Sequence, residues 1–288
     1  MLTAMVTMFA EDGSVDLDST AKVAAHLVDH GHDGLVVSGT TGESATTTIT
    51  EDGETLRTVR ETVGDRARVV AGVGTNDTRT TLQLVRQATE AGADGLLLVT
   101  PYYNRPSQSG VLHHFEQVAE ATDVPIMLYD VPGRTGTQIA WDTYVRIAER
   151  DNVVAVKDAV GDFGRGVRLS SELGFAVYSG DDHSNLGWLA HGACGFVSVA
   201  GHAAGQQLRA MGDAYRAGDH AQALEIYTRT VPAVDAIMRV PNYGATAAKA
   251  ALELLGVTDN RRVRSPLVEL DEDEVAALRR ALTTAGLL

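Results

Sequence analysis

The sequence predicts an α/β fold, a (β/α)8 TIM barrel with a C-terminal helical appendage. Runs of apolar, β-branched residues alternate with stretches of helical spacing along most of the chain, which is the order of a parallel α/β fold. These runs are near-continuous rather than alternating, as in parallel strands covered on both faces. A related phrase also recurs, as "HGHDGLVV" from His30, "AGADGLLL" from Ala91 and "HGACGFVS" from His191. Each phrase combines a helix-ending glycine with an apolar strand, so a repeated strand–helix unit accounts for the chain; a doubly wound sheet is the alternative.

The predicted strands are short and evenly distributed. They are Leu2–Val6, Gly34–Ser38, Arg68–Val73, Gly95–Thr100, Pro125–Tyr129, Val153–Lys157, Phe175–Ser179 and Gly195–Val199. The stretch 76–91 represents the intervening helices, with Asn76 as its expected cap and Gly92 at its end.

The pattern changes after Gly218, where no further strand is predicted. The segments 220–240, 243–256 and 271–286 have helical spacing, and Pro241 and the stretch 258–268 interrupt them. We therefore expect a catalytic barrel over residues 1–218 and a three-helix region over 219–288.

The composition of the chain restricts the classes of function that it can have. The 288 residues are 44% hydrophobic, enough for a sizeable core, and carry a net charge of −14. Nucleic acid is not an expected partner, because phosphate binding requires clustered lysine and arginine. Cys194 is the single cysteine, so no intramolecular disulfide forms. The N-terminus lacks the pattern of a signal peptide and no 18-residue apolar run occurs, so we expect a cytoplasmic protein with no membrane partner.

Polar residues follow most of the predicted strands at the end where barrel enzymes place their active sites. The stretches are "SGTTGES" (38–44), "TPYYNRP" (100–106), "YDVPGRTG" (129–136), "VKDA" (156–159), "SGDDH" (179–183) and "FVSVAG" (196–201). A purely structural barrel would not require this pattern, so we expect a site there.

Lys157 is the leading candidate for chemistry. It is one of three lysines and the fifth residue of an apolar run. Burial lowers the pKa of an amine and frees the neutral form to attack a carbonyl carbon. The plainer interpretation is a lysine that reaches solvent beside Asp158. Lys22 and Lys249 lie in helical segments and are expected to be ordinary, so a Schiff base would form on Lys157.

Neighbouring motifs fit such chemistry. Tyr129 is also the fifth residue of its run, on the adjacent predicted strand, and a phenol there could relay protons; alternatively its ring fills the barrel. The hydroxyls and backbone N–H groups of 39–44 could bind a carboxylate, although they are also common turn residues. Arg134 could bind a carboxylate, or lie on the surface.

Other features favour structural roles. Residues 181–183 could ligate a metal, but no second cluster has ligand spacing, and helix capping by Asp182 is preferred. His113 and His114 are expected to face different ways on one helix. The segment 72–77 lacks the third glycine of a dinucleotide loop. We therefore expect neither a cofactor nor a metal.

Five motifs occur together in order across the whole chain: "GTTGES", "TPYYNRPSQ", "YDVPGRTG", "VKDA" and "SGDD". In this set the chain resembles the pyruvate-dependent class I aldolases and lyases related to dihydrodipicolinate synthase. The double threonine, "PYYN" and the arginine of "PGRTG" favour the synthases, since neuraminate lyases generally carry serine in place of the first threonine. Asp130 stands where many members have asparagine.

The resemblance implies a role for each matching residue. Lys157 would form an imine with pyruvate, and the enamine would condense with aspartate semialdehyde, a reaction of diaminopimelate and lysine biosynthesis. Catalytic proton transfer would use Tyr129, Thr40 and Tyr103. The substrate-binding residues would be Thr41, Arg134, Val197 and Gly180. Because Tyr103 would reach in from a neighbouring subunit, the resemblance also implies a homotetramer built from dimers.

Three alternatives remain open from the sequence. The first is a sister class I aldolase that acts on a 2-keto-3-deoxy sugar acid through the same lysine. The second is a metal-dependent aldolase or hydratase using Asp181, Asp182 and His183. The third is a non-catalytic barrel that serves as a binding or regulatory protein.

Overall fold

The strands of the computed structural model, which describes residues 1–239 and 243–288, confirm the predicted barrel. In that part of the chain eight parallel strands follow one another in sequence order and close into a barrel. They are β1 (Leu2–Ala4), β2 (Gly34–Val37), β3 (Arg68–Gly72), β4 (Gly95–Val99), β5 (Ile126–Asp130), β6 (Val153–Asp158), β7 (Ala176–Ser179) and β8 (Gly195–Ser198). Each overlaps a predicted run, because a near-continuous apolar, β-branched run buries its side chains as a parallel strand that is covered on both faces.

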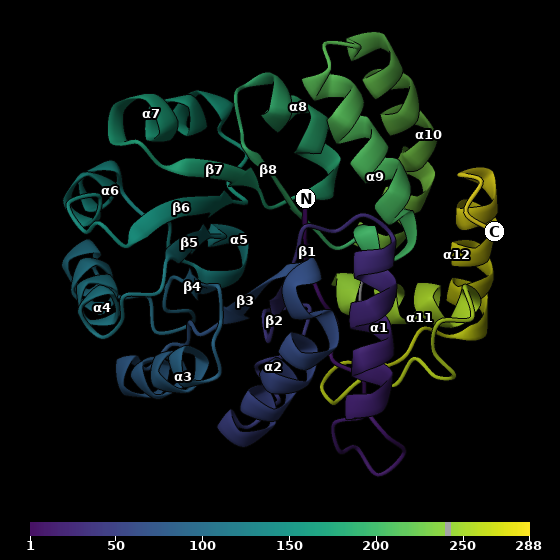
Figure 1. Ribbon diagram of the computed structural model, residues 1–288, viewed down its shortest axis with the longest axis horizontal. Helices are drawn as coiled ribbons and strands as arrows, with labels where there is room; N and C mark the ends of the chain where they lie inside the picture. The colour runs from purple at the N-terminus through teal and green to yellow at the C-terminus, as the bar shows by residue number, and fades with distance from the viewer. Residues whose placement is uncertain (240–242) are drawn as a thin grey trace. The chain divides into compact units, whose positions relative to one another are not determined.

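Residues 1–67 and 197–288 form one compact unit. Its helices are α1 (Leu17–Asp29), α2 (Ile49–Val63), α9 (Gly201–Arg216), α10 (His220–Met238), α11 (Tyr243–Leu254) and α12 (Glu272–Thr284), with the short 3-10 turn η1 (Gly64–Arg66). Helices α1 and α2 lie side by side, and α10 packs against α9, α11 and α12 (Figure 1). The three predicted C-terminal helices are confirmed, while the break expected at Pro241 lies outside the described residues. The domain boundary at residue 218 stays a prediction.

Residues 68–196 form a second compact unit that carries β3 to β7 and the first part of β8. Its helices are α3 (Thr78–Glu90), α4 (Gln108–Glu120), α5 (Pro132–Thr135), α6 (Trp141–Ile147), α7 (Phe163–Leu173) and α8 (Asn185–Ala190), with the 3-10 turn η2 (Asp182–Ser184). Figure 1 shows α3, α4, α6 and α7 along the outer side of the strands of this unit.

Local hydrogen bonds define where the helices begin. Thr48 and Glu51 form a reciprocal capping box at the start of α2, so two otherwise unpaired N–H groups are satisfied. The expected cap of α3 was wrong by one residue. Asp77, not Asn76, accepts the bond from Arg79 N, and the backbone oxygen of Asn76 instead accepts a bond from the Asn104 amide.

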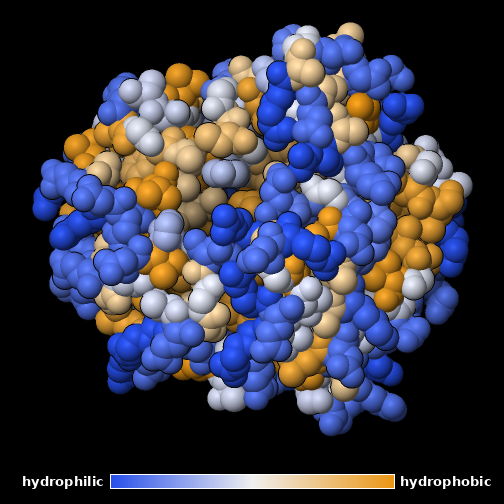
Figure 2. All heavy atoms as spheres, in the orientation of Figure 1, coloured by the Kyte–Doolittle hydropathy of each residue, from blue (hydrophilic) through white to orange (hydrophobic). Residues whose placement is uncertain are grey.

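Apolar side chains of the strands form the interior. Leu35, Leu96 and Leu98 are each fully buried, as expected for strands covered on both faces. Hydrophilic residues cover most of the face seen in Figure 2, with apolar residues gathered over α12. No helix among the described residues has the length and apolar character needed to cross a membrane.

Buried histidines make the fold sensitive to acid. Burial lowers the pKa of His32 to about 3 and those of His114 and His202 to about 4. His114 is buried and its neighbour His113 is exposed, which confirms that the two face different ways. Below a pH of about 6.5 the unfolded chain therefore binds protons that the folded chain does not.

We expect the free energy of unfolding to fall as the pH drops from 6.5 toward 4, by up to ~1.4 kcal/mol per pH unit for each buried histidine. Urea denaturation at pH 7, 6 and 5 measures this slope. His114→Gln should reduce the slope, with His113→Gln as the matched control. An identical slope in the His114→Gln variant would contradict the assignment.

Candidate active site

The pairing of β5 with β6 places Tyr129 directly opposite Lys157. The strands do not pair residue for residue, because the register shifts between Ile126 and Met127 and leaves Val154 as an extra residue on β6. The side chain of Val154 is 43% exposed. Successive side chains of a strand point to opposite faces, so if Val154 were paired instead of bulged, Lys157 would stand opposite Asp130 and point away from the face that carries Tyr129.

Lys157 is held out of water beside an aromatic ring. Its side chain is 5% exposed, and its Nζ lies 4.2 Å from the centroid of the Tyr129 ring. Burial lowers the pKa of Lys157 to about 8; the nearby Asp182 carboxylate opposes this shift and the Arg134 guanidinium adds to it. Roughly one lysine in ten is then neutral at pH 7. This amine can act as a nucleophile toward a carbonyl carbon.

A second lysine is also buried, and the expectation that Lys249 is ordinary was wrong. Its side chain is fully buried, and burial lowers its pKa to about 8 as well. Its Nζ forms an ion pair with Glu43 and donates a hydrogen bond of 2.8 Å to the Arg262 carbonyl. These acceptors hold the ammonium form in place, whereas Lys157 faces an aromatic ring. Lys157 is therefore the candidate nucleophile on structural grounds as well as by its position in the strand.

Asp130 and Asp158 follow Tyr129 and Lys157 and are likewise paired across β5 and β6. Asp130 is fully buried and accepts bonds from Arg165 Nη2 at 2.7 Å and from the Tyr144 hydroxyl at 3.2 Å. Burial raises the pKa of Asp130, and the arginine opposes that shift. A carboxylate at this position thus has a cationic partner. Arg165 and Tyr144 were not anticipated, since neither belongs to a strand-end motif.

The residues after β7 also correct the sequence interpretation. Asp181, not Asp182, caps the turn η2 by accepting a bond from His183 N. Asp182 is 1% exposed and accepts a bond of 2.9 Å from the Asn185 amide. The capping prediction failed because two aspartates stand side by side and only one of them faces the helical turn. In the described residues, no three His, Cys, Asp or Glu side chains are grouped as a metal site would require.

Gly180 has a packing role that a side chain would disrupt. Its N–H donates a bond of 2.7 Å to the Asp158 carbonyl. An added Cβ would lie 2.9 Å from that same oxygen, a distance that real Cβ atoms do not tolerate. The absence of a side chain therefore lets the end of β7 approach the end of β6 closely, beside Lys157.

Tyr103 differs from the other expected residues because it projects into solvent. Its side chain is 88% exposed, and its backbone has a φ of +73°. A non-glycine residue with positive φ is strained, so the surrounding loop must hold it there. Its N–H donates to the Thr135 carbonyl at 3.4 Å, on the short helix α5 that also carries the exposed Arg134.

The expected site residues divide between the two units. Lys157, Tyr129, Tyr103, Arg134 and Gly180 all lie in residues 68–196. In the other unit, Thr40 is exposed and Thr41 is buried in the loop after β2, and Val197 is buried in β8.

Comparison with known proteins identifies the family. A family model described as the dihydrodipicolinate synthetase family matches residues 1–285. The chain belongs to the dihydrodipicolinate synthetase family. This confirms the resemblance drawn from the sequence motifs.

Relatives extend over nearly the whole chain. A protein of Kineococcus radiotolerans named 4-hydroxy-tetrahydrodipicolinate synthase is 54% identical, over 100% of this chain and 93% of its own. A crystal structure of a dihydrodipicolinate synthase from Bacillus anthracis is 42% identical with a TM-score of 0.93, covering 98% of this chain and 96% of that one. A synthase from Acinetobacter baumannii complexed with pyruvate is 36% identical with a TM-score of 0.93, covering 100% and 98%.

The bulge at Val154 gives a direct test of the site. Insertion of a second residue beside Val154 should lower the catalytic activity by about 10²-fold or more, because the bulge accommodates one extra residue and regular pairing after it then moves the amine off the face shared with Tyr129. Val154→Thr keeps the length of β6 and should retain activity. Steady-state assays of both variants, with circular dichroism to monitor folding, make the comparison. A folded insertion variant with wild-type activity would show that the register is not needed.

Proposed function

We propose that this protein condenses pyruvate with L-aspartate 4-semialdehyde through a Schiff base on Lys157, as a 4-hydroxy-tetrahydrodipicolinate synthase of the class I aldolase type. The observation that carries the proposal is the buried amine of Lys157, 4.2 Å from the Tyr129 ring centroid, in a chain of this family. The relative 54% identical to it bears the name of that synthase, and a pyruvate complex is known for a synthase 36% identical to it. No cofactor is required.

The reaction begins when neutral Lys157 Nζ attacks C2 of pyruvate. Loss of water gives an imine, and removal of a methyl proton gives an enamine whose carbon attacks the aldehyde of the second substrate. The amino group of that substrate then attacks the imine carbon, which closes the ring and releases the lysine. The partly lowered pKa of Lys157 serves the first step, because only the unprotonated amine has a free electron pair.

The remaining residues bind and move protons. Tyr129 lies against the amine and relays protons during imine formation, together with Thr40 and with Tyr103 of a neighbouring subunit. Thr41 and the backbone of Val197 bind pyruvate. Arg134 binds the carboxylate of the semialdehyde, and the backbone of Gly180 contributes to the same substrate site.

Assembly follows from the role of Tyr103. The side chain of Tyr103 is 88% exposed, so it is available to enter the site of a neighbouring subunit and join the relay of that subunit's lysine. We propose a homotetramer built from dimers, in which each dimer pairs two such sites. The protein works in the cytoplasm on small-molecule substrates.

Borohydride reduction tests the nucleophile. Treatment with pyruvate and borohydride should leave a stable pyruvate-derived adduct on the peptide that contains Lys157, and mass spectrometry locates it. Lys157→Arg should form none. An adduct on Lys249, or none in the wild-type protein, would overturn the proposal.

The rate of adduct formation should depend on pH through the Lys157 amine. Because its pKa is about 8, the neutral fraction, and with it the rate, rises about tenfold per pH unit below that value and levels off above it. Asp182 opposes the lowering, so Asp182→Asn should move the midpoint to lower pH. A midpoint above 10 in the wild-type protein would contradict a desolvated lysine.

Mixing two inactive variants tests the subunit-crossing relay. Tyr103→Phe and Lys157→Ala should each lose most activity, since one lacks a proton donor and the other lacks the nucleophile. Subunit exchange between them should restore part of the activity, because some sites then combine an intact lysine with an intact tyrosine. Native mass spectrometry confirms the mixed assembly. Mixed assemblies without recovered activity would show that Tyr103 does not act in the site of a neighbouring subunit.

A further inference from the structure

The loop after β2 is held in a strained conformation. Glu43 has a φ of +59°, in the left-handed region that a non-glycine residue adopts only when its surroundings hold it there. Its N–H donates to the Thr40 carbonyl at 3.1 Å, and Ser44 N donates to the Gly39 carbonyl at 3.3 Å. These bonds close a turn whose members are Thr40, Thr41, Gly42 and Glu43. The position of Glu43 therefore determines where the two threonines lie.

The Glu43 side chain is bound at both oxygens by the C-terminal part of the chain. The residue is 4% exposed. Oε1 pairs with Lys249 of α11, and Oε2 accepts a bond of 2.9 Å from the backbone N–H of Arg264. Lys249 also donates to the Arg262 carbonyl. A glycine would relieve the strain at this position, but it would provide no carboxylate for these donors.

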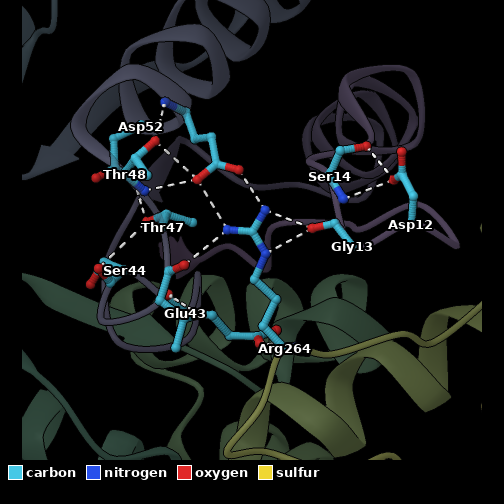
Figure 3. Close-up of polar contacts among 11 residues, drawn as sticks. Asp12, Gly13, Ser14, Glu43, Ser44, Thr47, Thr48, Asp52 and Arg264 are labelled. Atoms are coloured by element: carbon cyan, nitrogen blue, oxygen red, sulfur yellow. Dashed lines mark hydrogen bonds and ion pairs between the residues drawn. The ribbon is translucent and has the colours of Figure 1, made fainter.

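Arg264 adds a second connection to the same region. Its guanidinium donates to the Gly13 carbonyl at 2.6 and 2.9 Å, to the Thr46 carbonyl at 2.9 Å and to Glu51. Figure 3 shows this group between the Gly13 loop and the residues at the start of α2. We call the set of Glu43, Lys249 and Arg264 the clamp. It joins the turn after β2 to the segment between α11 and α12.

We propose that Glu43 is a positioning residue for Thr40 of the proton relay and for the pyruvate-binding Thr41, and that Lys249 and Arg264 act on the reaction by holding Glu43 in place. This inference rests on the proposed function of Thr40 and Thr41. In this view the C-terminal part of the chain takes part in the reaction, because through the clamp it sets how readily the loop after β2 binds the first substrate.

The competing explanation is a purely structural ion pair. A buried ion pair often adds little stability of its own. Loss of one partner nevertheless destabilises the fold, because it leaves an unpaired charge in the interior. The two roles differ in what a neutral replacement does. Neutralising both partners removes the unpaired charge, so stability returns, but it does not restore the anchored position of the turn.

The test uses Lys249→Met alone and combined with Glu43→Gln, whose side-chain oxygen can still accept the Arg264 N–H bond. The single variant should unfold at lower temperature, and the double variant should recover most of that loss. Both variants should still form the borohydride-trapped adduct on Lys157. Their kcat/KM for pyruvate should be lowered roughly tenfold, equivalent to ~1.4 kcal/mol of positioning energy. The kcat/KM for the aldehyde should be nearly unchanged, since its attack follows imine formation.

Glu253→Gln is the matched control. Glu253 lies on α11 and pairs with Arg261 at 2.6 Å, so its loss weakens the same helix and segment without touching the turn. It should lower stability while kcat/KM for pyruvate stays at the wild-type value.

Three results would overturn the inference while the proposed function stands. In the first, the wild-type protein forms the adduct on Lys157, but the clamp variants react with pyruvate within about twofold of the wild-type rate. In the second, the double variant recovers both its stability and its reactivity toward pyruvate. In the third, the Glu253→Gln control loses reactivity toward pyruvate to the same extent as the clamp variants. A wild-type protein that forms no adduct on Lys157 would instead remove the proposed function, and the inference with it.

Discussion

A primary amine kept out of water at the end of a strand is the constraint on which the rest of this structure depends. An ammonium ion is stable in water and costly to bury, so a buried lysine persists only where the fold compensates for its lost hydration. At Lys157 the compensation is partial: an aromatic ring at 4.2 Å and a carboxylate nearby. Partial compensation leaves a fraction of the amine neutral near pH 7, which is the state that carbonyl chemistry needs.

The contrast with Lys249 shows that burial alone does not make a nucleophile. Both lysines have a pKa lowered to about 8 by burial. Lys249, however, lies between the Glu43 carboxylate and the Arg262 carbonyl oxygen, so its ammonium group donates to acceptors that are part of the folded chain. The two lysines thus share a lowered pKa and differ in their partners: Lys157 faces an aromatic ring, whereas Lys249 holds two parts of the chain together.

The sequence predicted those parts of the fold and site that depend on local patterns. Most of the strands lie where apolar runs end in polar motifs, and Lys157 and Tyr129 were each expected as the fifth residue of adjacent runs. That expectation came from counting residues from the start of each run, whereas the actual pairing starts one residue later on β5 and is restored by the bulge. The agreement therefore rests on a feature that counting did not detect.

Contacts between distant residues could not be predicted in this way. Lys249 and Glu43 are separated by 206 positions, and a helical lysine gives no local sign of its buried partner. Arg165 reaches Asp130 from a helix 35 positions away. Adjacent candidates were also ambiguous: only the fold decides that Asp181 caps the turn and that Asp182 lies buried near the lysine.

The bulge on β6 separates two kinds of evolutionary constraint. The Val154 side chain is 43% exposed, so many residue types could occupy its position without disturbing the core. What is not free is that this residue stays out of the pairing, since regular pairing of Val154 would turn the Lys157 amine to the other face. Among relatives, this position should therefore vary in identity while the pairing of the residues after it stays the same. A measure of importance based on residue identity would overlook it, although the orientation of the amine depends on the bulge.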